Sequence, residues 1–351
     1  MINNLNDDDD NNNNNINMIR VCSYNCLAQC YIKREWFPQT RDGKLLKWSE
    51  RKKNLVQKIG EVNADIVCLQ EIDNFDKEWK DFFLTSNKDD DDDDDDDDGT
   101  ASSFGVFYKQ RTQKTNKKKD GSLVSWRTEV FDFMDERAIE FNDIVLSDER
   151  VKSSSEEEKN EYERDCVAAL VLLKHKVTER MIVVVSCHLY WDPKYEHVKM
   201  KQAEYLRKQI DRFVLEKCSS KSSSKSSTDY VNNSNNKLDE DIGIIVGGDF
   251  NSIPTERVYK SMIENGYKSM MKNPNEPLFT TVTPGFTETI DYIFCSSSSS
   301  SDEGKTKWIK ECRPISMKSR DLLFDGCPCD GEPSDHLAIS CDIVLANTTI
   351  M

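Results

Sequence analysis

The chain has 351 residues, 37% of them hydrophobic, and a formal net charge of −16. Two aspartate runs, Asp7–Asp10 and Asp89–Asp98, hold 14 of the acidic residues, and without them the charge is about −2, so the acidity does not exclude an anionic substrate. The length suits one large α/β domain or two small ones. No apolar stretch is long enough to cross a bilayer, and we expect a soluble protein that does not contact membranes.

The 12 cysteines are scattered, and several lie in apolar runs, where free thiols pack as small hydrophobic groups. The close pair Cys327 and Cys329 has no second pair that would complete a zinc site. The N-terminus is rich in Asn and Asp and has neither an apolar signal core nor a basic amphipathic leader. These features predict a reduced, intracellular protein of the cytoplasm, or also of the nucleus.

The first predicted strands each end in a polar residue. Residues 1–17 are a polar tail that we expect to be disordered. Ile19–Tyr24 alternates between apolar and polar residues as a strand does, and Asn25 follows it. Ala64–Leu69 is a continuous apolar run, typical of a buried strand, and it leads to Glu71.

A helix is predicted between these two strands. Ser49 would cap it, and Leu55 and Ile59 would lie on its apolar face. After the second strand, residues 76–84 have helix-like spacing. The long aspartate run then falls in an insertion near residues 87–100, which we expect to be a disordered surface loop, because backbone so highly charged cannot be buried.

Five strands are predicted in the middle of the chain, at Phe104–Tyr108, from Gly121 onward, at Ala138–Val145, at Cys166–Leu173 and at Met181–Cys187. The last of them leads to His188. The basic segment Lys109–Lys119 is either a solvated loop or a grip that steers a polyanion in a salt-dependent way. A Ser/Glu-rich insertion near residues 152–160 is expected to be disordered.

The rest of the chain alternates helices, strands and polar insertions. Helical spacing predicts a helix over Tyr195–Val214, and Pro254 would lie in the first turn of another. Strands are predicted at Thr289–Phe294 and Leu337–Val344, and disordered insertions near 219–236 and 296–304. Because the insertions lie between the predicted elements, we expect one folded catalytic body over residues 18–346.

The stretch Ile244–Ser252 has the strongest chemical signal. A short apolar run ends in two glycines, and Asp249 and Asn251 follow, with side chains on the same side of an extended chain. The glycines leave the backbone bare where another group approaches closely. The carboxylate and the amide would hold a water and a phosphate oxygen, although a strand-to-loop turn with polar capping accounts equally well for this stretch alone.

Polar residues able to bind metal or phosphate follow or begin six β-rich runs: Asn25, Glu71, His188, Asp249 with Asn251, Asp291, and Asp335 with His336. Glu71 is a hard oxygen ligand that suits Mg²⁺, which takes one or two carboxylates and keeps several waters. Asn25 would complete the metal shell or donate a hydrogen bond to the phosphate. Asp249 would orient and deprotonate a water, so the set fits phosphodiester hydrolysis.

Each of these residues also has a purely structural interpretation. A histidine at a strand end, such as His188 or His336, often satisfies a loop carbonyl instead of donating a hydrogen bond to a phosphate oxygen. Asp291 suits a turn, and Asp335 suits a helix or turn cap. Cys187 lacks the positive cluster of a thiol nucleophile, and we interpret it as a core residue.

In this order, the segments resemble the exonuclease–endonuclease–phosphatase superfamily, and within it the carbon catabolite repressor type of deadenylase with its relatives nocturnin, angel and 2′-phosphodiesterase. The resemblance extends from Ile19 to Val344. The matching motifs are Ser23-Tyr24-Asn25-Cys26-Leu27-Ala28, Leu69-Gln70-Glu71, Lys118-Lys119-Asp120-Gly121, His188-Leu189-Tyr190-Trp191-Asp192-Pro193, Gly248-Asp249-Phe250-Asn251-Ser252, Ile290-Asp291-Tyr292-Ile293-Phe294 and Ser334-Asp335-His336.

The resemblance implies an α/β fold of two packed, mostly antiparallel β-sheets flanked by helices, a four-layer α/β sandwich with the site at its top edge. It implies that Glu71, with Asn25 and Asp335 nearby, holds Mg²⁺ or Mn²⁺. His336, oriented by Asp291, would stabilise the transition state.

The resemblance also assigns the residues around the substrate. His188 would contact the scissile phosphate, and Asp249 and Asn251 would position the nucleophile and the phosphate. The family's adenine clamp, a proline and an aromatic residue, would fall on Pro193 and Phe286, and Trp191 joins them as a substrate-binding residue. Stacking on an aromatic ring is worth ~1–3 kcal/mol per base. Without the resemblance, Pro193 would be read as a rigid turn and Phe286 as a hydrophobic plug.

We therefore expect a Mg²⁺-dependent 3′-exoribonuclease that prefers poly(A) and releases 5′-AMP by in-line attack of water on RNA. The nearest alternative keeps the chemistry but takes 2′-5′ oligoadenylate, a cyclic phosphate end or NADP. The alternative of a different class is a non-catalytic RNA-binding scaffold. A scaffold would lack at least one metal or histidine position, and none is missing in this sequence.

The sequence departs from the family pattern in three respects. No leucine-rich repeat precedes the catalytic region, so we do not expect the docking surface with which some relatives join a large deadenylase complex. Asp120-Gly121 continues with Ser122 where relatives often have Cys, and Cys166 stands where Asn is common. None of these changes affects the proposed metal shell, and they leave the subfamily open.

Overall fold

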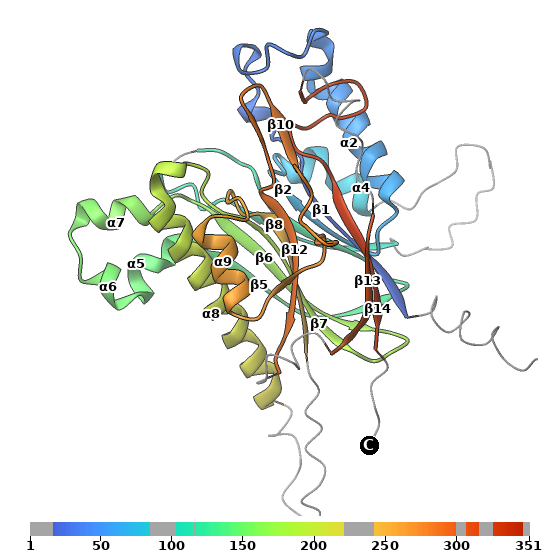
Figure 1. Ribbon diagram of the computed structural model, residues 1–351, viewed down its shortest axis with the longest axis vertical. Coiled ribbons are helices and arrows are strands. Elements are labelled where there is room, and N and C mark those ends of the chain that lie inside the picture. Colours follow the sequence, from blue (N-terminus) through green and yellow to red (C-terminus); the bar gives the residue numbers. More distant parts are fainter. Residues whose placement is uncertain are drawn as a thin grey trace, which may run out of the picture.

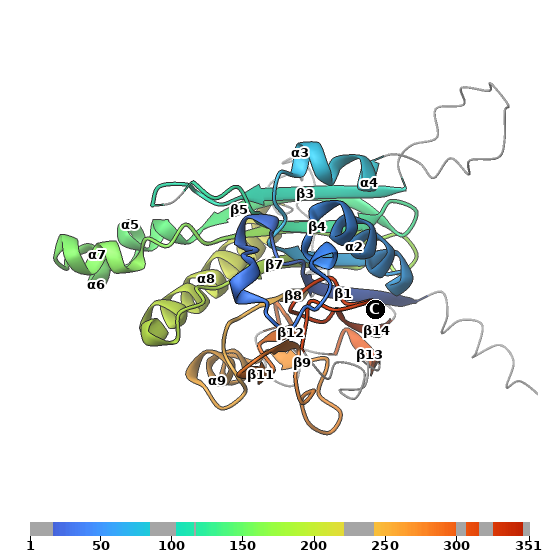
Figure 2. The ribbon, with the colours of Figure 1, turned by 90° about the horizontal axis from the view of Figure 1, so that it is seen from above.

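The computed structural model describes residues 17–84, 103–115, 117–220, 242–299, 307–315 and 326–346. Within these ranges, two six-stranded β-sheets pack against each other between layers of helices (Figures 1 and 2). The predicted α/β sandwich is confirmed. The predicted tail, apart from residue 17, and the insertion near 87–100 lie outside the described residues, as do most of the insertions near 219–236 and 296–304. Ser296 and Ser297, which we expected to begin a disordered insertion, instead form the buried end of a strand.

The first sheet has the strand order β13-β14-β1-β2-β4-β3. Its strands are β1 (Met18–Asn25), β2 (Ile66–Gln70), β3 (Phe104–Gln110), β4 (Gly121–Arg127), β13 (Ile309–Pro314) and β14 (Ile339–Leu345). Strands β1 and β2 are parallel, and the other neighbours in this sheet are antiparallel.

The second sheet has the strand order β5-β6-β7-β8-β12-β9. Its strands are β5 (Phe131–Glu140), β6 (Val167–His175), β7 (Met181–His188), β8 (Gly243–Asp249), β9 (Lys268–Ser269) and β12 (Asp291–Ser297). Strands β7 and β8 are its parallel pair. A separate hairpin consists of β10 (Thr281–Thr283) and β11 (Phe286–Glu288).

Helices cover the outer face of each sheet. The first sheet is covered by α2 (Trp48–Val62), α3 (Phe75–Glu78) and α4 (Lys80–Leu84), and the second by α8 (Glu196–Ser220) and α9 (Arg257–Glu264) (Figure 1). Three short helices connect β5 to β6: α5 (Ile144–Ser147), α6 (Glu149–Lys152) and α7 (Glu156–Tyr162). The described 3₁₀ turns are η1 (Gln29–Tyr31), η2 (Arg34–Trp36), η3 (Gly43–Leu46), η4 (Phe141–Asp143) and η5 (Pro193–Tyr195). None of the helices described here is long and apolar enough to cross a membrane.

The central core lies between the two sheets because side chains alternate along each strand. Val184 on β7 and Ile245 on β8 point into the space between the sheets, where they join Ile66 of β2. Their neighbours Val183 and Val185 point the other way and pack against α8 and α9. The continuous apolar runs in the sequence therefore mark strands that are buried on both faces.

Three predictions of local structure are wrong. Helix α2 begins at Trp48, with Lys47 at its N-cap and no side-chain cap, so Ser49 lies within its first turn. Helix α9 begins at Arg257, and Pro254 lies in the turn before it. The strand predicted at Ala138–Val145 ends at Glu140, and it begins much earlier, in a stretch whose exposed charged residues suit an edge strand rather than a buried one.

The segment 152–160 is also not the disordered insertion that we expected. It contains the end of α6 and most of α7. The Asp148 carboxylate caps α6, and the Ser155 hydroxyl accepts a hydrogen bond from the backbone N–H of Glu158 at the start of α7. Three glutamates in the first turn of α7 complement the positive end of the helix dipole.

Candidate active site

The strand register brings the predicted residues together at one edge of the sandwich. Asn25 ends β1, and Glu71 directly follows the neighbouring parallel strand β2. His188 pairs with Asp249 at the ends of the parallel strands β7 and β8. Asp291 begins the antiparallel strand β12 opposite Asp249. Parallel strands end at the same edge of a sheet, so residues far apart in sequence become neighbours here.

The remaining predicted residues lie in the loops at this edge. Asn251 follows β8 in a left-handed conformation, and its side chain donates a hydrogen bond to the carbonyl of Leu189. Asp335 and His336 precede β14, and His336 forms an isolated bridge with Thr281 of the β10–β11 hairpin. All eight predicted metal and catalytic positions therefore lie at or directly beside this edge.

The Asp249 carboxylate is the centre of the site. Its Oδ2 lies 3.1 Å from Nδ2 of Asn25, 3.6 Å from Nε2 of His188 and 3.6 Å from Nε2 of His336. Its Oδ1 accepts a 2.8 Å hydrogen bond from the backbone of Asn251. Burial, together with the nearby charge of Asp291, raises the pKa of Asp249, which makes it a better proton acceptor than an exposed aspartate.

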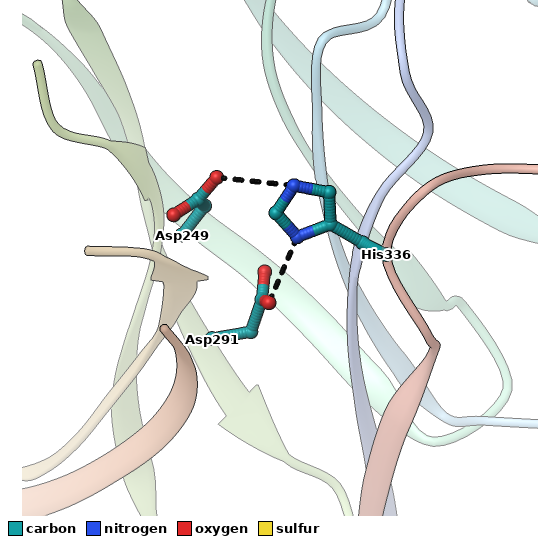
Figure 3. A group of neighbouring side chains, drawn as sticks. All are labelled: Asp249, Asp291 and His336. Carbon is teal, nitrogen blue, oxygen red and sulfur yellow. Dashed lines mark hydrogen bonds and ion pairs between the residues drawn. The ribbon is translucent and has the colours of Figure 1, made fainter. Parts of the chain in front are cut away.

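His336 lies between two carboxylates (Figure 3). Its Nδ1 is 2.9 Å from Oδ2 of Asp291, an atom that also accepts a 2.6 Å hydrogen bond from the Thr280 hydroxyl. Burial lowers the pKa of His336, but the charges of Asp291 and Asp249 outweigh it and hold the pKa well above its ordinary value. The imidazole is therefore cationic, and its Nε2 faces Asp249.

Glu71 is held by its neighbours in a strained backbone conformation, with φ of 58°. Its Oε2 accepts a 2.8 Å hydrogen bond from the backbone of Ala28, and its Oε1 accepts one of 3.2 Å from Asn25. Burial and the charges of Asp120 and Asp335 raise the pKa of Glu71 to about 7. This part of the site carries more buried negative charge than its cations balance.

Because of this negative charge, the residues near Glu71 suit a divalent cation. Glu71, Asp335 and Asp249 offer hard carboxylate oxygens, the ligands that Mg²⁺ prefers. Asn25 presents Nδ2 to the carboxylates, while its Oδ1 accepts from the backbone of Leu27. In this geometry Asn25 is therefore a hydrogen-bond donor, and as a metal ligand its amide would have to turn.

Among the described residues, a different group of side chains has the spacing of metal ligands. Ligand atoms of Asp249, Asp291 and His336 all lie within 4.8 Å of one another. Nδ1 of His336 and Oδ2 of Asp291 are, however, occupied by their mutual hydrogen bond. We therefore interpret this group as a charged acid–base assembly, with the Glu71 side better suited to Mg²⁺.

Arg111 is a site residue that the sequence analysis missed. The sequence placed it in a basic segment expected to be either a solvated loop or a grip for a polyanion, but its side chain is only 10% exposed and its Nε lies 2.7 Å from Oδ2 of Asp120. Its Nη2 lies 3.4 Å from Nδ1 of His188. Burial, opposed in part by Asp249, lowers the pKa of His188 to about 4, so this imidazole is neutral. Arg111 directly follows the end of β3, the same strand-end signal that located the other residues.

Arg51 is a second residue that the sequence did not reveal, and it holds two loops of the site in place. This fully buried guanidinium on α2 donates to the carbonyls of Cys26, Leu27 and Pro333. It thereby joins the loop after β1 to the loop that carries His336. The amphipathic pattern of α2 gave no sign of this, because a charged residue on a helix is expected to face solvent.

The predicted substrate-binding residues lie on exposed segments that begin at the site. Trp191 is 64% exposed and Phe286 is 45% exposed, and Pro193 is exposed at the start of η5. Trp191 and Pro193 follow His188 along the chain, and Phe286 lies in the hairpin that contacts His336. An open aromatic face is what stacking on a base requires.

Comparison with known proteins places the chain in a family. The sequence model of the Endonuclease/Exonuclease/phosphatase family matches residues 22–212 and 223–336. The chain is 26% identical over 363 residues to "Carbon catabolite repressor protein 4 homolog 4" of Arabidopsis thaliana, covering 92% of this chain and 76% of that protein. It is 27% identical over 350 residues to "CCR4-Not complex 3'-5'-exoribonuclease subunit Ccr4" of Candida albicans, covering 91% of this chain and 40% of that protein.

Two solved structures share the fold over nearly the whole chain. The human Nocturnin catalytic domain superposes with a TM-score of 0.61 at 20% identity, covering 94% of both chains. The structure of ANGEL2, described as a 2',3'-cyclic phosphatase, superposes with a TM-score of 0.61 at 20% identity, covering 93% of this chain and 95% of that chain. These similarities establish the fold.

Proposed function

The chain belongs to the Endonuclease/Exonuclease/phosphatase family, and from this premise we propose that it is a Mg²⁺-dependent 3′-exoribonuclease acting on poly(A) ends and releasing 5′-AMP. The observation that carries the proposal is the joining of Glu71, His188, Asp249 and His336 at one buried edge. A non-catalytic scaffold would have no reason to bury so many unlike charges together, since each costs desolvation energy.

The side chains divide the reaction between them. Asp249 accepts the proton of the attacking water, helped by its raised pKa and held in place by the backbone of Asn251. The cationic His336 offsets negative charge that develops on the phosphoryl oxygens, and Asp291 keeps it charged and oriented. The neutral His188 donates a hydrogen bond to a non-bridging oxygen. When bound beside Glu71, a divalent cation supplies further charge relief and orients the phosphate.

The choice of substrate rests on the relatives and on the exposed aromatic residues. The Candida albicans relative is named a 3'-5'-exoribonuclease subunit, and ANGEL2 is described as a 2',3'-cyclic phosphatase, so the family chemistry serves more than one phosphate ester. We favour RNA because Pro193 and Phe286 offer exposed surfaces that a terminal adenine would stack upon, and Trp191 adds a further exposed ring beside the site. We further propose that the protein acts in the cytoplasm or also in the nucleus, where such RNA ends occur.

A substrate panel tests the proposal. The full chain is incubated with 3′-5′ oligo(A), oligo(U), 2′-5′ oligo(A), an RNA with a 2′,3′-cyclic phosphate end and NADP, each with Mg²⁺ or with EDTA, and Glu71→Ala is the control. We expect 5′-AMP from oligo(A), faster than product from oligo(U), and none with EDTA or the variant. Hydrolysis of NADP or the cyclic phosphate but not of oligo(A) would overturn the substrate, and activity that survives both EDTA and Glu71→Ala would overturn the mechanism.

A further inference from the structure

A cluster of one cation and three aromatic rings lies directly beyond the end of β7. The guanidinium carbon of Arg164 is 4.7 Å from the ring centroid of Tyr190 and 4.6 Å from that of Tyr195. The two tyrosine rings are 5.8 Å apart in an edge-to-face arrangement. Trp191 lies at the margin, 6.1 Å from Tyr190. We refer to these four side chains, Arg164, Tyr190, Trp191 and Tyr195, as the Arg164 platform.

The backbone of the platform is fixed to the catalytic edge. The backbone N–H of Leu189 donates to the carbonyl of Asp249, and its carbonyl accepts from the side chain of Asn251. The backbone N–H of Tyr190 donates a 2.8 Å hydrogen bond to Gln202 of α8. Trp191 is only three residues from His188, so the two Cα atoms are at most about 11 Å apart. The platform is therefore within reach of the nucleotides next to the scissile phosphate.

The cation of the platform is partly exposed and has no carboxylate partner among the described residues. Nε of Arg164 is buried and has no hydrogen-bond partner among the described residues. The acidic residues closest to it in sequence already have other partners: Asp165 accepts hydrogen bonds from Asn142 and from the backbone of Lys114 and Thr115, Glu163 pairs with Lys114, and Glu161 pairs with His197 at 3.0 Å. An arginine held between rings, without a carboxylate partner, is suited to a phosphate group, which it binds through several N–H donors.

We propose that the Arg164 platform binds the unpaired bases and the phosphate of a single strand next to the scissile nucleotide. Trp191, 64% exposed, provides the stacking face, and Arg164 provides the charge. Stacking on a π-face is open to every base, so this grip selects single strands over duplexes, irrespective of base identity. The inference rests on the proposed nuclease function, and it is separate from adenine selection by Pro193 and Phe286.

Binding to an inactive chain tests the platform without hydrolysis. Labelled ten-nucleotide oligo(A), oligo(U) and an RNA duplex of the same length are titrated with the full-length Glu71→Gln chain, and the dissociation constants are measured by fluorescence anisotropy. Added Trp191→Ala or Arg164→Met should weaken binding of both single strands about 5- to 100-fold. Trp191→Phe should restore most of the loss, and duplex binding should be weak and unchanged.

Trp36→Ala is the matched control, since Trp36 is 55% exposed on a different loop. Three results would each overturn the platform. They are a loss of affinity for Trp191→Ala no larger than for Trp36→Ala, an equal loss of affinity for duplex and single strand, and no binding of single strands at all. Circular dichroism confirms that each variant is folded. If the single strands bind through Trp191 but the wild-type chain does not cleave them, the platform stands and the exoribonuclease proposal fails.

Discussion

At the scale of single residues, the two histidines on either side of Asp249 differ in charge, because one is cationic and the other is neutral. Both Nε2 atoms lie 3.6 Å from the same Oδ2 of Asp249. His336 has Asp291 behind it and is held cationic, whereas His188 has Arg111 behind it and is neutral. Both rings are buried, so burial alone does not explain why their pKa values differ. The difference comes from the residue that contacts Nδ1 of each ring.

Asp291→Asn tests the support of His336. The variant keeps the shape of the side chain but removes the charge that holds His336 cationic, so we expect kcat on oligo(A) to fall about 10²- to 10⁴-fold with little change in KM. Steady-state kinetics in saturating Mg²⁺ measure this. Thr280→Ser, which retains a hydroxyl near Asp291, is the matched control and should stay close to wild type. A kcat of Asp291→Asn near the wild-type value would show that His336 needs no anionic partner.

Glu71 should make the proposed metal binding dependent on pH. Its pKa in the folded chain is raised to about 7 from an ordinary 4.5, so between these values the folded chain holds a proton that the unfolded chain has lost. This group therefore lowers the free energy of unfolding of the metal-free chain as pH rises through that window. A cation must displace the same proton, and at pH 6 only about a tenth of Glu71 is ionised.

We therefore expect Mg²⁺ to stabilise the chain more at pH 8 than at pH 6. An approximately tenfold difference in apparent affinity corresponds to about 1.4 kcal/mol, or a few degrees in Tm. Thermal unfolding with and without 5–10 mM Mg²⁺, on the order of an ordinary assay concentration, measures the difference. In Glu71→Gln the Mg²⁺-induced shift should be small at both pH values, and equal shifts in the wild-type chain at both pH values would contradict the assignment.

At the scale of elements, helix α2 contributes to the site without carrying a catalytic residue. Its position 51 lies on the buried face with Leu55 and Ile59, four and eight residues further on. Arg51 donates from there to carbonyls of two loops, one leading from Asn25 and one leading to Ser334. The Ser334 hydroxyl completes the connection by donating to the carbonyl of Asn25 at 2.7 Å.

Replacing Arg51 should therefore affect both stability and activity. Arg51→Met leaves three buried carbonyls without their donor, at about 1–3 kcal/mol each, so we expect the free energy of unfolding to fall by more than ~3 kcal/mol. Urea denaturation measures this. Lys53→Met on the same helix is the control, since the Lys53 side chain is 73% exposed, and it should change stability by less than about 0.5 kcal/mol. Equal effects of the two substitutions would contradict the role of Arg51 in joining the two loops.

At the scale of the whole molecule, the two sheets are in close contact where β8 packs against β1 and β2. A Cβ atom on Gly247 would lie 2.8 Å from Cβ of Cys68, 3.0 Å from its Sγ and 3.2 Å from Cβ of Ser23. Gly247 lies two residues before Asp249, so this approach sets the distance between the half of the site on β8 and the half on β1 and β2.

Gly247→Ala should therefore separate the sheets slightly. Overpacking of this kind costs about 1–3 kcal/mol, and we expect that loss in the free energy of unfolding together with reduced activity. Gly43→Ala is the matched control, because a Cβ there has no atom within 4 Å. Chemical denaturation and the oligo(A) assay of both variants measure the effects. If Gly247→Ala were as stable as the wild-type chain, the sheets would have enough space between them for a Cβ atom at this position.

The sequence by itself determined most of the strands and the residues at their ends. Apolar runs such as Met181–Cys187 and polar residues such as Asn25 and Asp249 are local signals, because burial and strand geometry repeat over a few neighbouring residues. The edge strand β5, the helix α7 in the Ser/Glu-rich segment and the start of α2 were missed or misplaced because their sequences are polar, and polar segments fold by capping and tertiary contacts rather than by periodicity.

Only the tertiary structure decided which side chains meet and in what charge state. Arg51 and Arg111 are ordinary basic residues in the sequence, and they become site residues because folding buries them against loops from distant parts of the chain. The different charge states of His188 and His336 likewise depend on whether Arg111 or Asp291 contacts Nδ1 of the ring. Electrostatic interactions in a buried site depend on distance through space, which a linear sequence does not contain.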